Sequence, residues 1–183
     1  MLKKFYLPLA LATAPLITAT NLTKQPVATP TNTSANTKNE RINAAKQSLA
    51  LEIQTMLAIS NKALSAQKEV LKDGFDELYQ RVMKIVHQVL NLPEFTQAVE
   101  NMTELQKNSI LFDTQINEED FTNLALVSKV NEALAQEFPS LDEQTEKLFN
   151  IMYVTIANIL ANKQLLNKLD AETKNLTATT KDQ

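Results

Sequence analysis

The segment LFNIMYVTIANIL, residues 148–160, is apolar around nearly the whole circumference of a helix. It spans 13 residues and contains Asn150 and Asn158, so it is shorter than the ~20 apolar residues that a helix needs to cross a bilayer. A helix that is apolar on every side is typical of the position most enclosed by its neighbours. The segment therefore predicts the central helix of an all-α protein.

The residues before this segment predict where its helix begins. Ser140-Leu141-Asp142-Glu143 has the spacing of a capping box, in which Ser140 bonds forward and Glu143 bonds back. We expect the helix to run from there to about Leu169 or beyond. Pro139 ends the preceding helix, because proline cannot continue it.

That preceding helix is predicted to begin at Asn117. Asn117 can cap the first turn, and the acids at positions 118–120 would lie at the positive end of the helix. Ile116 can then contact Phe121 as a hydrophobic staple. The helix is expected to end at about Glu137.

Pro93 marks the boundary between two earlier helices. A proline disfavours continuation of the helix before it and fits the first turn of the helix that follows. The apolar residues that follow recur at a helical spacing, which predicts that they line one face. They are Phe95, Ala98, Val99, Met102, Leu105 and Phe112.

The region 39–90 also has a helical period. Five apolar residues recur every seven positions: Ile42, Leu49, Met56, Ala63 and Val70. Ala45, Ile53, Ile59 and Leu64 widen this stripe, which predicts a side of ordinary width that faces the core. Gly74, the single glycine, can end a helix in the left-handed conformation, with Phe75 folding back on the last turn. The apolar spacing nevertheless continues across Gly74, which favours one kinked or continuous helix roughly 75 Å long. The fold prediction is an elongated all-α bundle of four to five helices in residues 39–176.

The N-terminus has the order of a secretory signal peptide, predicted at residues 1–19. Lys3 and Lys4 precede an apolar stretch, and small residues follow it up to a cleavage position after Ala19. The alternative is an uncleaved membrane anchor. We expect export to the periplasm, the cell surface or the extracellular medium.

Both ends of the mature chain are poor in large apolar residues. Residues 20–38 are dominated by Thr, Asn and Pro and predict a flexible, disordered spacer. Residues 177–183 predict a disordered tail. Glycosylation triplets such as Asn21-Leu22-Thr23 are expected by chance in a chain so rich in Asn and Thr.

Composition excludes several kinds of site. The chain has no cysteine, so it has neither disulfides nor thiolate metal ligands. Its formal net charge is -3, which becomes more negative when Lys3 and Lys4 leave with the signal peptide. The two arginines, Arg41 and Arg81, are too few for a nucleic-acid surface.

His87 is the only histidine and the first candidate for chemistry. On a helical projection it lies with Asp76, Gln80 and Lys84, away from the apolar side, which predicts a solvated position. No second histidine or cysteine is available to complete a zinc site. The expectation is that His87 is neither catalytic nor a metal ligand.

The carboxylates are also weak candidates. Counted as a calcium loop, residues 113–124 place Glu118 where glycine is required and Leu124 where a bidentate acid is required. The pairs Glu143 with Glu146, and Asp170 with Glu172, fit a solvated helix surface. Three further residues, Tyr79, Met83 and Tyr153, are predicted in the core or at its edge. We predict no catalytic residue, no cofactor and no metal site.

These observations favour an exported, non-enzymatic helical protein that acts through surface contacts with a protein partner or with itself. The alternative is a membrane-active or lipid-binding protein whose bundle opens, so that residues 148–160 contact acyl chains.

Overall fold

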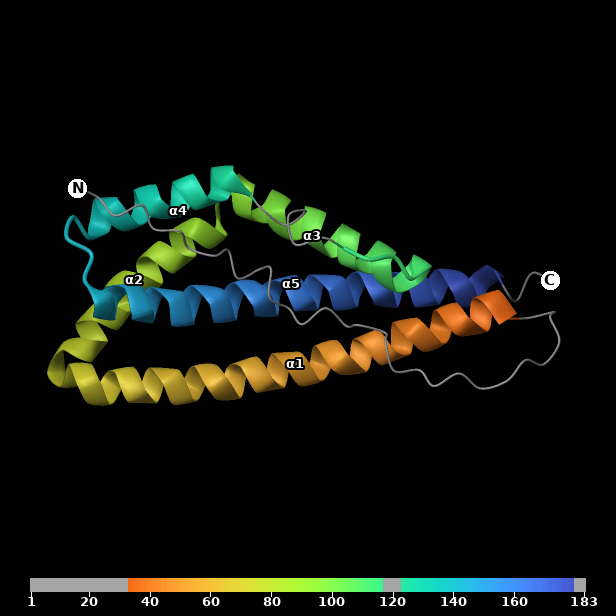
Figure 1. Cartoon of the computed structure of the whole chain (residues 1–183), viewed down its shortest axis with the longest axis horizontal. Coiled ribbons are helices and arrows are strands. Elements are labelled where there is room, and N and C mark those ends of the chain that lie inside the picture. The colour runs from red at the N-terminus through yellow and green to blue at the C-terminus, as the bar shows by residue number, and fades with distance from the viewer. Residues whose placement is uncertain (1–32, 117–122, 180–183) are drawn as a thin grey trace.

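In the computed structural model, the backbone is described for residues 33–116 and 123–179, and the side chains for residues 37–116 and 123–176. Within these ranges the chain forms five α-helices and one short 3₁₀ helix, and no strand. The elements are α1 (Thr33–Leu71), η2 (Lys72–Gly74), α2 (Phe75–Leu90), α3 (Pro93–Phe112), α4 (Leu124–Glu137) and α5 (Glu143–Thr179). They form an elongated bundle (Figure 1), which confirms the predicted all-α class.

Helix α5 lies at the centre of this bundle. In Figure 1 it runs between α1 on one side and α3 and α4 on the other, and α2 crosses its N-terminal half. The side chains of Phe149 and Tyr153 are stacked, with ring centroids 5.3 Å apart, and both are buried. Leu148, Met152 and Ala157 are buried beside them. The segment 148–160 is therefore part of the central helix, as its composition predicted.

The buried apolar residues form two clusters. The larger one joins α2, α3, α4 and the first half of α5, and includes Val82, Val99 and Phe149. The smaller one joins the first half of α1 to the end of α3 and the second half of α5: Ile42, Ala45, Leu49, Leu111, Leu165 and Leu169. Among the described residues, no side chain of α1 between positions 49 and 64 belongs to either cluster or packs against it.

The prediction of one kinked or continuous helix across Gly74 is wrong. Helix α1 ends at Leu71, and the chain turns through η2 so that α2 packs against α5. The left-handed residue is Lys72 (φ 48°), whereas Gly74 keeps a right-handed φ of -80°. A left-handed non-glycine residue costs ~1–2 kcal/mol. This cost is smaller than the gain from burying Phe75 and Val82, which a straight continuation would carry away from α5.

The capping box predicted at Ser140 is also wrong. Asp142 caps α5, since its Oδ1 accepts a hydrogen bond of 2.8 Å from the backbone N–H of Thr145. Glu143 does not bond back but forms an ion pair with Lys147 at 2.7 Å. Asp is as effective an N-cap as Ser, and spacing alone does not distinguish the two start positions.

The other helix boundaries agree with the sequence in part. Pro93 begins α3, and α4 ends at Glu137, as predicted. The predicted cap Asn117 and the Phe121 staple lie outside the described residues. In the part that is described, α4 begins at Leu124 and Asn123 caps it, accepting a hydrogen bond of 3.0 Å from the N–H of Leu126.

The helical part of the chain is longer at both ends than the predicted range 39–176. Helix α1 begins at Thr33, so residues 33–38 of the predicted spacer are helical, and α5 continues to Thr179, into the predicted tail. The signal peptide, residues 1–19, and the first part of the spacer lie outside the described residues. Within α3, Phe112 is exposed and its neighbour Leu111 is buried instead, against the prediction.

Replacing a core residue of α5 tests the central position of this helix. Phe149 is fully buried, so Phe149→Ala should lower the free energy of unfolding by ~3–5 kcal/mol. Leu160→Ala is the matched control, because Leu160 lies on the same helix and is 41% exposed; it should cost less than ~1 kcal/mol. Chemical denaturation followed by circular dichroism measures both, and equal losses would contradict the central position of α5.

Candidate functional site

His87 lies on the exposed side of α2, together with Asp76, Gln80 and Lys84, as its helical position predicted. Its backbone carbonyl accepts hydrogen bonds from the backbone N–H and the side-chain amide of Asn91, at 3.2 and 2.8 Å. These bonds supply hydrogen-bond donors to a backbone carbonyl in the last turn of α2. Within the described ranges, the imidazole takes part in no hydrogen bond or ion pair.

The candidate carboxylates form ion pairs on the surface. Asp170 pairs with Lys46 of α1, and Glu172 lies 4.0 Å from Lys107 of α3. Within the described ranges, no group of three or more His, Cys, Asp and Glu residues could hold a metal ion. The segment 113–124 tested as a calcium loop lies partly outside those ranges.

The most perturbed acid in the bundle is Tyr153. Its side chain packs between Phe149 and Phe95, and burial raises its pKa to about 12. Its hydroxyl has no hydrogen-bond partner among the described residues. A phenol held neutral and enclosed in this way is a core residue, and it cannot act as a base near neutral pH. Tyr79 and Met83 are half-buried at the edge of the same core, as predicted.

Burial of Tyr153 should make the fold less stable at alkaline pH. Between pH ~10 and about 12 an unfolded tyrosine loses its proton while buried Tyr153 keeps it, so stability should fall as the pH rises through this window. Tyr153→Phe should remove this part of the loss and leave stability at pH 7 unchanged or increased, because a buried unpaired hydroxyl is unfavourable. Urea denaturation across this pH range measures both effects. Tyr79→Phe is the control and should keep the loss; an identical pH profile in Tyr153→Phe would contradict the burial.

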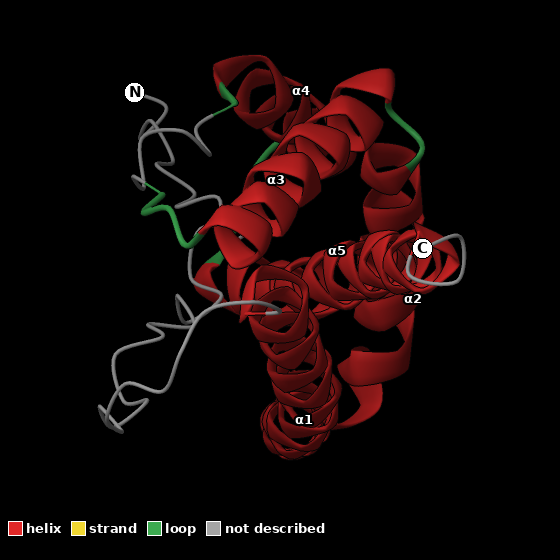
Figure 2. Cartoon of the chain, turned by 90° about the vertical axis from the view of Figure 1, so that its right-hand side faces the viewer, coloured by secondary structure: helices red, strands yellow, loops and turns green. Residues whose placement is uncertain are grey.

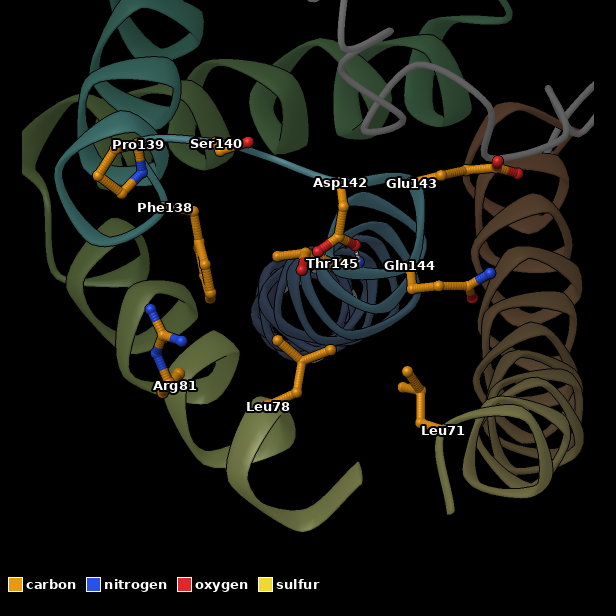
Figure 3. Close-up of a pocket in the computed structure, with 10 residues that line it drawn as sticks. All are labelled: Leu71, Leu78, Arg81, Phe138, Pro139, Ser140, Asp142, Glu143, Gln144 and Thr145. Atoms are coloured by element: carbon orange, nitrogen blue, oxygen red, sulfur yellow. Dashed lines mark hydrogen bonds between the residues drawn. The ribbon is translucent and has the colours of Figure 1, made fainter. Parts of the chain in front are cut away.

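A pocket of about 640 Å³ lies at the end of the bundle where the α1–α2 turn meets the start of α5. Figure 3 shows Leu71, Leu78 and Phe138 around the first turn of α5, with Arg81 beside Phe138. The Arg81 guanidinium lies 4.4 Å from the centroid of the Phe138 ring. The pocket thus has an apolar wall and a polar rim.

The charges around this pocket are already paired. Arg81 donates to the Glu137 carboxylate at 3.2 Å and to the Glu137 carbonyl at 2.9 Å. Hydrogen bonds from Arg81 and then Lys84 lower the pKa of Glu137. Asp142 caps α5 and Glu143 pairs with Lys147. A charged ligand would have to break these pairs, so the pocket is suited to an uncharged group.

A second candidate site is a face of α1 that no other helix in the described part of the chain covers. We define the outer face of α1 as Ala44, Ser48, Leu51, Thr55, Ala58, Ile59 and Lys62, which follow one another at a spacing of about three to four residues. Leu51 is 65% exposed and Ile59 is 64% exposed. Between Lys46 and Lys62 the only ionisable residue is Glu52. A solvated helix face normally carries several charged residues, and this one carries only Lys62, at its end.

The opposite side of the same stretch of α1 includes buried and half-buried polar residues. Ser60 is the only buried residue of α1 beyond Leu49, and it lies five helical turns from buried Ile42, on the same side. Glu52 is half-buried near Asn162 of α5, which is 2% exposed, and burial raises the pKa of Glu52. Asn158, one turn before Asn162, is buried as well. In its middle, α1 therefore turns both polar and half-buried apolar residues, such as Ser60, Ile53 and Met56, toward the bundle and leaves Leu51 and Ile59 exposed.

The outer face was not predicted from the sequence, because the predicted core-facing stripe includes Ile59. That prediction is wrong for Ile59 and for Val70, which are 64% and 61% exposed. The signal that could have indicated it is the stretch QSLALEIQTMLAISN, residues 47–61, with a single charge in fifteen residues.

No protein-family model, no curated protein and no solved structure matches this chain. None of the helices in the described ranges is both long enough and apolar enough to span a membrane.

Proposed function

We propose that the chain is an exported, non-enzymatic helical protein that binds a protein partner or another copy of itself through the outer face of α1. The observation that carries the proposal is the exposure of two large apolar side chains, Leu51 and Ile59, on the outer face, in a stretch of α1 with a single ionisable residue. Export is supported by the basic and apolar order of residues 1–19.

The energetics of this face favour a partner. Burying a Leu or Ile side chain stabilises a complex by ~1.5–3 kcal/mol when the side chain starts fully exposed, so Leu51 and Ile59 can each contribute most of that amount. Because no charged residue lies between Lys46 and Lys62 except inward-facing Glu52, a partner helix would desolvate few charges there. Small residues such as Ala58 allow a close approach.

The membrane-active alternative has less support. Its predicted lipid-binding segment, residues 148–160, has Phe149 and Tyr153 buried between helices, so lipid contact would require the bundle to open. Helices that lie in a membrane interface are rich in Lys and Arg on their polar side. Residues 47–61 of α1 contain neither. A role that does not involve catalysis is supported by the exposure of His87 and the pairing of the charges around the pocket.

Site-specific photocrosslinking tests the proposal. A photoreactive amino acid replaces Leu51 on the outer face or, as the matched control, Gln88 on the exposed side of α2. We expect covalent adducts at position 51 and few at position 88 when the exported protein is irradiated in the periplasmic, cell-surface or extracellular fraction of its host.

The adducts at Leu51 are identified by mass spectrometry as a specific protein or as the chain itself. The absence of adducts at Leu51, or equal labelling at both positions, would contradict the use of this face. Lipid adducts at Leu51, together with co-sedimentation with liposomes, would favour the membrane alternative instead.

A further inference from the structure

We infer that the pocket at the start of α5 binds a small, uncharged molecule that carries an amide group on an apolar body. The pocket has a volume of about 640 Å³. This lies within the ~300–1,000 Å³ of typical small-molecule sites. The pocket is separate from the outer face of α1, so the inference goes beyond the proposed function and does not depend on it.

Four parts of the chain meet around this pocket. They are the end of α1, the first half of α2, the α4–α5 connection and the first turn of α5, and Figure 3 shows their side chains around that turn. Leu71 and Leu78 are half-buried, since they pack against the larger apolar cluster and also line the pocket. Together with the ring of Phe138 they form an apolar wall to which three of the four parts contribute.

The polar side of the pocket is held in place without a ligand. Arg81 donates to the carboxylate and to the backbone carbonyl of Glu137, at 3.2 and 2.9 Å, and its guanidinium lies over the ring of Phe138. Pro139 follows that ring and restricts the backbone beside it. Asp142 is held by its capping bond of 2.8 Å. A ligand that enters a pre-formed site of this kind has little side-chain ordering to impose.

Two polar groups that line the pocket keep free hydrogen-bonding capacity. In the described part of the chain, Arg81 uses Nε and Nη2 on Glu137, and its Nη1 group donates to no acceptor. Asp142 uses Oδ1 for the cap, and its Oδ2 accepts from no side chain or backbone group there. Both side chains reach solvent. A donor from α2 and an acceptor from the α4–α5 connection match the C=O and N–H groups of an amide.

The charges around the pocket disfavour ions. Asp142 and Glu143 place two carboxylates at its rim, while Glu137 balances the charge of Arg81. An anion would meet these two carboxylates, and like charges in contact are destabilising. A cation would have to approach Arg81 or displace Lys147 from Glu143. An uncharged amide avoids both costs and still uses the free donor and acceptor.

A nuclear magnetic resonance titration of the purified protein with N-acetylphenylalaninamide tests the site, because this probe is uncharged and joins two amides to an apolar ring. The backbone N–H signals of Leu78, Ser140 and Thr145, which line the pocket, should shift as the probe is added. The signals of Leu51 and Ile59 on the outer face of α1 are the control and should not shift. Pocket signals that shift no more than these two would overturn the inference.

Two related probes test the class of ligand. N-Acetylglycinamide keeps the amides without the apolar ring, and N-acetylphenylalanine keeps the ring but carries a carboxylate. Both should bind at least about tenfold more weakly than N-acetylphenylalaninamide, because one loses the apolar contact and the other meets Asp142 and Glu143. Equal affinity for either related probe would overturn the proposed class.

The Asp142→Asn substitution tests the polar contact without removing the helix cap, because Asn and Asp are equally good N-caps. Its Oδ1 can keep the cap, and Nδ2 then presents a donor where the N–H of the ligand needs an acceptor. The variant should bind N-acetylphenylalaninamide about fivefold more weakly than the wild type. It should also bind the anionic N-acetylphenylalanine more tightly, since one carboxylate is gone.

The matched control is Asp170→Asn, which makes the same change of charge in the second half of α5 and should leave both affinities unchanged. Equal affinities in Asp142→Asn and the wild type, or equal changes in the two variants, would overturn the contact with Asp142.

The outcomes are independent of those for the outer face. If the pocket signals shift while position 51 gives no adducts, the ligand site stands and the proposed function is wrong. If position 51 gives adducts to a protein while the pocket signals do not shift, the proposed function stands and the ligand site is wrong.

Discussion

The fold depends on the burial of α5 by the helices around it. Its first half supplies Phe149 and Tyr153 to the larger apolar cluster, and its second half supplies Leu165 and Leu169 to the smaller one. Without disulfides, these two clusters must hold the other helices in place by packing. Between them α5 presents Asn158 and Asn162, so the middle of α1 faces a polar layer and has no apolar cluster to join.

This polar layer determines the character of the exposed surface of α1. Buried Asn and Ser residues form hydrogen bonds but contribute less to stability than apolar contacts of the same area. Helix α1 is thus held firmly near its ends, by Ile42 and Leu49 on one side and by Leu64 and Leu71 on the other, and weakly in between. Its exposed Leu51 and Ile59 are then available to a partner, and the contact would stabilise the segment that the bundle itself stabilises least.

Sequence reasoning predicted what depends on local chemistry. Apolar residues around the whole helix identified 148–160 as central, Pro93 began α3, and helical phase placed His87 on the surface. The turn at Lys72 was not predictable from local spacing, because the long-range packing of α2 on α5 decides it. Leu111 replaced Phe112 in the core for the same reason, since the contact with α1 sets the phase of the end of α3. Neither candidate surface, the pocket or the outer face, follows from periodicity alone.

Hydrogen exchange tests most directly the central claim that the bundle holds the middle of α1 less firmly than it holds α5. The backbone amides of residues 50–62 should exchange faster than those of α5 around Phe149, because this part of α1 joins neither apolar cluster. Equally slow exchange of residues 50–62 and of α5 would contradict the account.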